Sequence, residues 1–279
     1  MNFVDKALAR RLESAEEMPQ VQYAELYQKL RPEIHAEVAE FCGGHMIFAG
    51  LNSLIGRTVG AGFDGSLTAA ELDRMEQFYS AHQAPSQIDV CPLTDAPVLE
   101  LLKQRQYTMA ELNNVLFRPL DGNDFHEPDL RIRMGRRDEA EAFAIILQKS
   151  FFPNGDAPED FLPMLTPMFQ FQGVLLFVAE IDGRPAACGA GLIIPEHKIV
   201  ALFGAGTLPQ FRGRGLQTSL LKRRMAEAVK LGCEHAVIVT QGGTTSQRNA
   251  ERLGFQVAYS KATMLKPFKS LTTEDTKAY

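Results

Sequence analysis

Two glycines one residue apart, Gly213 and Gly215, alternate with Arg212 and Arg214 between an apolar run and an amphipathic segment. Glycine lets an anion approach the main chain closely, and free N–H groups at a helix start bind phosphate oxygens with the help of the helix dipole. Arginine adds charge-assisted hydrogen bonds. These residue types at this spacing predict a cradle for phosphate groups.

Two common phosphate-binding motifs do not fit the sequence. A Walker loop ends in Gly-Lys-Ser/Thr, whereas Gly215 is followed by Leu216 and Gln217. A dinucleotide fingerprint needs a third glycine after Gly204 and Gly206, and Pro209 occupies that position. The cradle is therefore of another kind.

The elements around the turn are expected to hold it in place. Residues 198–207 read as a strand, and the segment from residue 216 reads as a helix that Gly232 ends. A strand at 235–240, a polar segment at 241–249 and a further helix follow. One apolar face of the helix after the turn is formed by Leu216, Leu220, Leu221, Met225 and Val229.

The run from Thr207 to Gln217 resembles the pyrophosphate-binding motif Q/R-x-x-G-x-G/A of the GNAT superfamily of acyl-CoA-dependent N-acyltransferases. Gln210 or Arg212, Gly213, Arg214 and Gly215 fill it, but Gln217 stands where the family commonly has Gly or Ala. The strand–turn–helix order and a terminal Leu-Gly-Phe at 253–255 are also typical of the family. The resemblance covers about residues 130–267.

The resemblance implies an α/β (α+β) fold, in which a mixed, mostly antiparallel sheet is flanked by helices. It also implies transfer of an acetyl group from acetyl-CoA, as co-substrate, to the amine of a small-molecule or peptide acceptor. Ser246 is expected to cap the helix near the cofactor, and Asn249 to donate to the cofactor. The expected cofactor-binding residues are Ala205, Gly206, Thr207, Gln210, Phe211, Arg212, Gly213, Arg214, Gly215, Leu216, Gln217, Thr218, Ser246 and Asn249.

The sequence does not identify the catalytic acid or base. Many members of the family carry a tyrosine that protonates the leaving thiolate at the position of Ala250, so that acid is missing here. Water or Tyr259 are alternative proton donors. The candidates for the base are better explained as solvated or structural residues, and they are Glu180, Glu196, His197 and His235.

A shift of 148 positions lays the first half of the chain on the second without a gap. It predicts two tandem copies of one fold. The first has Asp64, Ser66 and Leu67 where the second has Arg212, Arg214 and Gly215, and an aspartate repels a phosphate. We therefore expect a degenerate N-terminal domain over 1–122 that does not bind the cofactor, a linker at 123–129, a cofactor-binding domain at 130–268 and a flexible tail at 269–279.

The composition limits the remaining possibilities. The 279 residues carry a net charge of −5, which argues against a nucleic-acid surface, and they contain no apolar run long enough for a membrane span. The N-terminal residues do not resemble a signal peptide, so a cytoplasmic location is expected. The four cysteines lie far apart and are expected to be reduced, and no spacing indicates a metal site. The oligomeric state stays open.

Two other functions remain compatible with the sequence. The missing acid and base would suit a non-catalytic acyl-CoA sensor or interaction module. The cradle by itself would also suit a nucleotide-binding protein, which would bind ATP and CoA with equal affinity.

Overall fold

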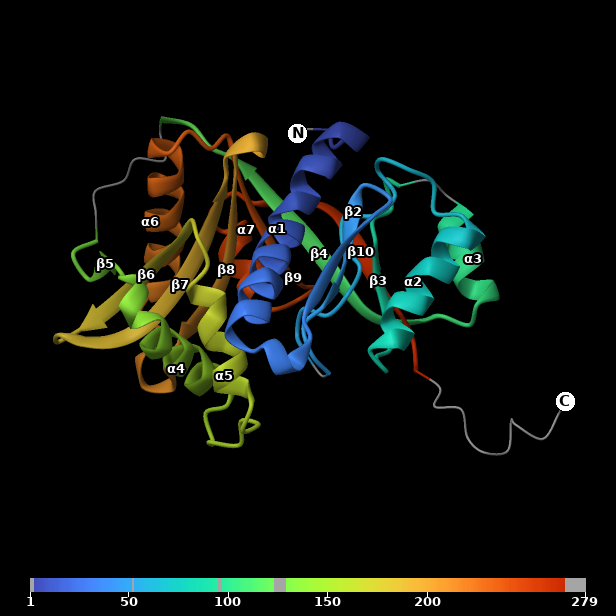
Figure 1. Cartoon of the computed structure of the whole chain (residues 1–279). Coiled ribbons are helices and arrows are strands. Elements are labelled where there is room, and N and C mark those ends of the chain that lie inside the picture. The colour runs from blue at the N-terminus through green and yellow to red at the C-terminus, as the bar shows by residue number, and fades with distance from the viewer. Residues whose placement is uncertain (1–2, 52, 95–96, 123–128, 269–279) are drawn as a thin grey trace, which may run out of the picture.

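The computed structural model describes residues 3–51, 53–94, 97–122 and 129–268. It forms one sheet of eight strands in the order β3-β10-β4-β9-β8-β7-β6-β5 (Figure 1), and a separate hairpin of β1 (Glu37–Phe41) and β2 (Gly44–Phe48). The only parallel pair among the described strands is β8–β9. The predicted mixed, mostly antiparallel sheet is therefore confirmed. Its strands are β3 (Ser86–Val90), β4 (Thr108–Pro119), β5 (Ile132–Met134), β6 (Val174–Ile181), β7 (Arg184–Ile194), β8 (Ile199–Thr207), β9 (His235–Gln241) and β10 (Gln256–Lys266).

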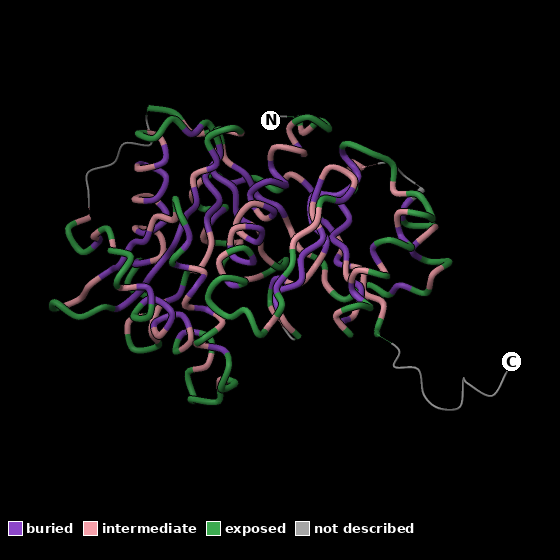
Figure 2. The backbone as a smooth tube through the Cα atoms, viewed as in Figure 1, coloured by how far each residue is buried: buried purple, intermediate pink, exposed green. Residues whose placement is uncertain are grey.

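Helices cover both faces of this sheet. On β8, Ile199 and Ala201 pack with α1 (Lys6–Leu30), whereas the alternate residues Val200 and Leu202 pack with α6 (Leu216–Lys230). Figure 2 shows the buried chain running along the strands between these layers. The other helices are α2 (Ala69–Ala81), α3 (Pro97–Gln104), α4 (Ala140–Phe151), α5 (Phe161–Leu165) and α7 (Thr245–Glu251).

Helix α1 crosses the sheet as one continuous element (Figure 1). Asp5 caps it by accepting a hydrogen bond from the Leu8 amide at 2.8 Å. The helix continues through Pro19. Its buried face, which includes Leu12 and Tyr23, packs into the main core and outweighs the unfavourable proline.

The expected strands at 198–207 and 235–240 are confirmed by β8 and β9, and the expected helix from residue 216 is confirmed by α6. The described residues of 51–55 form turns and no regular strand. Strand β1 contains two glutamates, and only Phe41 of its residues is fully buried. The expected tail at 269–279 lies outside the described residues.

Strand β4 joins the two halves of the chain. It pairs with β9 along Asn113–Pro119 and with β10 on its other edge, from Thr108 to Phe117. On its far side, β10 pairs with β3. A shift of 148 places β4 on β10, α2 on α6 and α3 on α7, each within one residue at either end, and β3 on β9, which continues three residues further. Helix α1 and strand β2 do not follow this shift.

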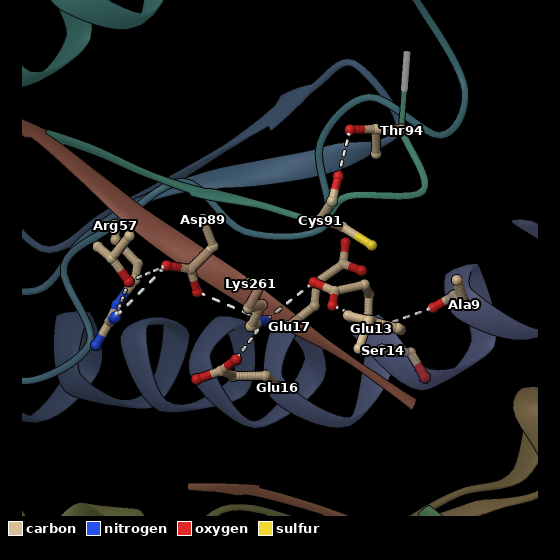
Figure 3. Close-up of polar contacts among 12 residues, drawn as sticks. Ala9, Glu13, Ser14, Glu16, Glu17, Arg57, Asp89, Cys91, Thr94 and Lys261 are labelled. Atoms are coloured by element: carbon tan, nitrogen blue, oxygen red, sulfur yellow. Dashed lines mark hydrogen bonds and ion pairs between the residues drawn. The ribbon is translucent and has the colours of Figure 1, made fainter. Parts of the chain in front are cut away.

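A buried charge cluster fastens α1 to β10 and β3 (Figure 3). The Lys261 ammonium is 1% exposed and lies 3.0 Å from Glu13, 2.5 Å from Glu16 and 3.6 Å from Asp89. Burial alone would lower the pKa of Lys261, but the three carboxylates raise it well above its usual value. Arg57 approaches Asp89 from the other side, at 3.5 Å. The cluster joins elements from both ends of the chain.

We predict that Lys261→Met destabilises the protein by about 3–5 kcal/mol, because it leaves buried carboxylates without their cation. Urea unfolding followed by circular dichroism measures the change. The control is Lys198→Met, whose ammonium is 60% exposed and pairs with Glu234 at 2.7 Å. That change is expected to cost less than about 1 kcal/mol. Equal unfolding free energies for the two variants would contradict the role given to the cluster.

Candidate functional site

Strands β8 and β9 pair over only part of their length. The parallel pairing joins Ile199, Val200 and Ala201 to residues 235–237 of β9. Beyond Ala201, no pairing with β9 is found among the described residues of β8, although β8 continues to Thr207. The two strands therefore diverge toward the end from which the chain enters the cradle.

The cradle has the backbone geometry of an anion site. After a single 3₁₀ turn at Pro209–Phe211, Gly213 and Gly215 adopt left-handed φ values of 77° and 75°. A Cβ atom at either position would meet nothing within 4 Å, so both glycines border open space. No hydrogen bond from the amides of residues 213–216 to another described residue is found. Gly215 is the N-cap of α6, so these amides stand at the positive end of its dipole.

The two arginines of the cradle differ in their contacts. Arg212 donates to the Ser150 carbonyl at 2.8 Å and to the Thr207 carbonyl at 3.4 Å. Arg214 is exposed, and its guanidinium lies 5.5 Å from the centre of the Phe211 ring. Arg212 uses these two donors to hold the turn against α4 and β8.

The small residues of β8 are required by protein packing. A Cβ on Gly206 would lie 2.7 Å from the Ser150 hydroxyl, and one on Gly204 would lie 2.7 Å from the Phe169 ring. Gly204 has a φ of 56° and belongs to a bulge, where the register of β8 against β7 shifts by one residue. Three residues at the end of β8 were expected to bind the cofactor. Ala205 is exposed, Thr207 is half-buried and Gly206 is buried.

Gln217 ties the first turn of α6 to the strands. Its side-chain amide donates to the Gly206 carbonyl at 2.9 Å, the Thr207 hydroxyl at 3.0 Å and the Cys188 carbonyl at 3.3 Å. Glycine or alanine, the common residues at this motif position, could make none of these contacts. Gln217 therefore fixes the start of α6 against the end of β8.

Helix α7 lies beside α6 and begins just after β9. The expectation that Ser246 caps it is wrong: Thr244 is the N-cap, and its hydroxyl accepts from the Gln247 amide at 3.3 Å. Thr244 has the extended backbone that a cap requires, whereas Ser246 already lies within the helix. Ser246 is exposed and Asn249 is half-buried.

Most residues considered as acid or base are buried, paired or away from the opening between β8 and β9, and Glu196 and His197 lie in the 3₁₀ turn before the paired end of β8. Tyr259 is buried on β10, which β4 and β9 separate from β8, and its hydroxyl donates to Glu13 at 2.7 Å. Glu180 pairs with Arg133 at 2.7 Å. His235 lies at the paired end of β9, where burial lowers its pKa. Ala250 is fully buried.

Sequence reasoning missed one charged residue beside the opening. Arg224 is only 2% exposed and lies on the buried side of α6. Arg224 comes four residues after Leu220 and three after Leu221, so it lies on the apolar face of the helix. A charged residue on that face is the sequence signal that could have identified it.

The comparisons with known proteins agree with this geometry. Residues 141–255 match the model of the Acetyltransferase (GNAT) family. This segment contains the cradle, both diverging strands and α7. No curated protein matches the chain.

Solved structures share the fold over most of the chain. A GCN5-related N-acetyltransferase from Kribbella flavida is 17% identical, with a TM-score of 0.62, and the match covers 90% of this chain and 97% of that one. A functionally unknown conserved protein from Staphylococcus epidermidis is 12% identical, with a TM-score of 0.52 over 72% of this chain and 79% of that one. A Drosophila protein is 14% identical, with a TM-score of 0.50 over 96% and 99%.

Three further findings concern cysteines, metals and membranes. All four cysteines are free thiols, as expected. Within the described ranges, no three histidine, cysteine, aspartate or glutamate side chains gather as metal ligands would. A search of the same ranges finds no helix whose length and apolar character would let it span a membrane.

We predict that the double change Gly213→Ala and Gly215→Ala weakens binding of inorganic pyrophosphate by about tenfold or more, since a left-handed conformation costs an alanine roughly 1–2 kcal/mol and the cradle must change shape. Calorimetric titration measures the affinity. The matched control is Gly232→Ala, which has a φ of 82° and equally open surroundings at the far end of α6. That variant should lose similar stability but bind pyrophosphate normally. Unchanged binding by the double variant would rule out the cradle.

Proposed function

We propose that this protein is an acetyltransferase that moves the acetyl group of acetyl-CoA to the amine of a small-molecule or peptide acceptor. The carrying observation is that a left-handed glycine pair with open amides starts α6 next to two strands that diverge. CoA has a diphosphate and a thin pantetheine arm that carries amide groups. The diphosphate needs free main-chain amides, and the arm needs a strand edge beside them. The family match over 141–255 supports this reading.

In this proposal, the amides of residues 213–216 hold the diphosphate of CoA. The arm then runs along β8 past Ala205 and Thr207 toward the point where β8 and β9 part. Arg214 is an exposed cation within the cradle, and it supplies charge from the surface. Ser246 and Asn249, on α7 beyond the opening, stay proposed contacts of the cofactor.

The proposed chemistry is direct transfer. The neutral amine attacks the thioester carbonyl carbon, the tetrahedral intermediate collapses, and the C–S bond breaks as the C–N bond stays. The amine loses one proton and the CoA thiolate gains one. Because the considered acids and bases are buried, paired or remote, water at the opening carries both protons in this proposal.

We further propose that the two halves are tandem copies of one fold that have exchanged their last strands. Under the 148-residue shift, β4 corresponds to β10 and β3 corresponds to β9. Strand β4 of the first half pairs with β9 of the second, and β10 of the second half pairs with β3 of the first. The proposed boundaries remain 1–122 and 130–268. In the first copy, the Gly62 amide donates to the Cys42 carbonyl at 2.9 Å, and Gly43 packs against Asp64. These contacts support a first copy that does not bind the cofactor.

A second candidate is an acyl-CoA sensor without turnover. The observation that favours it is the buried Ala250 at the position where many members of the resembled family carry the proton-donating tyrosine. A sensor would change its affinity for a partner on binding acyl-CoA and would release no thiol.

The test is incubation with acetyl-CoA and a panel of primary amines and peptides, with free thiol followed by a chromogenic disulfide and acetylated products identified by mass spectrometry. We expect amine-dependent thiol release that the double Gly213→Ala and Gly215→Ala variant lacks. Binding of acetyl-CoA without thiol release across the panel would favour the sensor. Equal affinity for ATP and CoA would favour a nucleotide-binding protein, and failure to bind either would exclude all three.

A further inference from the structure

Arg224 is a buried cation without a carboxylate partner. Its side chain is 2% exposed, and no ion pair joins it to any carboxylate of the described residues. Burial lowers the pKa of Arg224 to about 10, so it stays charged at neutral pH. The nearby Cys188 thiol does not neutralise it, because burial raises the pKa of Cys188 to about 12. An uncompensated buried charge is costly and calls for an explanation.

The guanidinium is held by main-chain carbonyls. It donates to Ala190 at 2.8 Å, to Leu220 at 3.2 Å and to Phe203 at 3.5 Å. Strand β7 leaves space for it at Gly189, where an added Cβ would lie 2.9 Å from the guanidinium carbon. The sheet thus accommodates an arginine at one specific place.

That place is the bulge of β8. The register between β7 and β8 shifts between Ala190↔Phe203 and Cys188↔Gly206, so β8 holds one extra residue exactly where Arg224 binds. The same stretch follows Ala201, the last residue of β8 that pairs with β9. Arg224 therefore lies directly behind the first residues that face the opening.

We propose that Arg224 is a positioning residue of the acyl-transfer site: it holds the bulge of β8 in shape and places a positive charge behind the thioester carbonyl. This inference rests on the proposed function. Bulges re-aim main-chain groups near active sites, and a fixed charge in a low-dielectric region strengthens the polarisation of a carbonyl that develops negative charge. The charge acts through the sheet and does not touch the substrate.

The experiment is isotope-edited infrared spectroscopy of acetyl-CoA labelled with ¹³C at the carbonyl, bound to the full-length protein. Polarisation of the thioester carbonyl lowers its stretching frequency. The displacement of this frequency from its value in water therefore reports the electric field at the site, and no amine acceptor is needed for the measurement. Arg224→Gln keeps an N–H donor at the position of Nε, which donates to the Leu220 carbonyl, but removes the charge, whereas Arg224→Lys keeps the charge. The matched control is Arg223→Gln, on the next position of α6, where the arginine pairs with Glu227 at 3.6 Å.

We expect the displacement to be lost in Arg224→Gln, largely kept in Arg224→Lys and unchanged in Arg223→Gln. CoA affinity should change by no more than about twofold in all three, because none of these side chains lies in the cradle. A displacement in Arg224→Gln equal to that of the wild type overturns the proposal. So do equal losses of thermal stability in the Gln and Lys variants with no change in frequency, which indicate a purely structural role.

The two proposals fail in different ways. If the wild-type protein does not bind acetyl-CoA, the proposed function fails and the role of Arg224 falls with it. If the wild type binds acetyl-CoA with a displaced carbonyl band that Arg224→Gln retains, only the role of Arg224 is lost.

Discussion

The opening between β8 and β9 depends on the pairing of β9 with β4. Beyond Val237, β9 has no pairing with β8, yet Ile238, Val239, Thr240 and Gln241 each pair with a residue of β4. A strand with one unpaired edge and no second partner would not keep its shape. Because β4 satisfies the other edge, β9 can stay extended where β8 no longer pairs with it. The N-terminal half therefore supplies the support that lets the C-terminal half open.

Two buried cations show how differently the fold treats charge. Lys261 is surrounded by Glu13, Glu16 and Asp89, so its charge is compensated and helps to join α1 to β10 and β3. Arg224 has only carbonyl partners, beside a bulge at the edge of the opening. A compensated charge serves stability, whereas an uncompensated one projects a field into its surroundings. The second kind is found where the proposed chemistry takes place.

Some features of the cradle follow from its own short sequence, whereas others depend on contacts with distant elements. The open amides and left-handed glycines at 213–216 follow from a short stretch of sequence, and they needed no other part of the chain to be recognised. The partners of Arg212 and Gln217 are carbonyls of Ser150, Cys188 and Gly206. Their roles could not be predicted, because those carbonyls come from other elements. The packing at Gly204 and Gly206 could not be predicted either, since the ring of Phe169 and the side chain of Ser150 exclude a Cβ there.

The sequence alone determined the strand at 198–207, the glycine turn after it, the helix that Gly232 ends and the strand at 235–240. These follow from hydrophobic periodicity, turn residues and glycine spacing, which act over a few neighbouring positions. Only the tertiary structure decided that α1 continues through Pro19, that β4 lies between β9 and β10, and where Lys261 and Arg224 are buried. Each of these depends on contacts between residues more than thirty positions apart, and such contacts leave no periodic pattern in the chain.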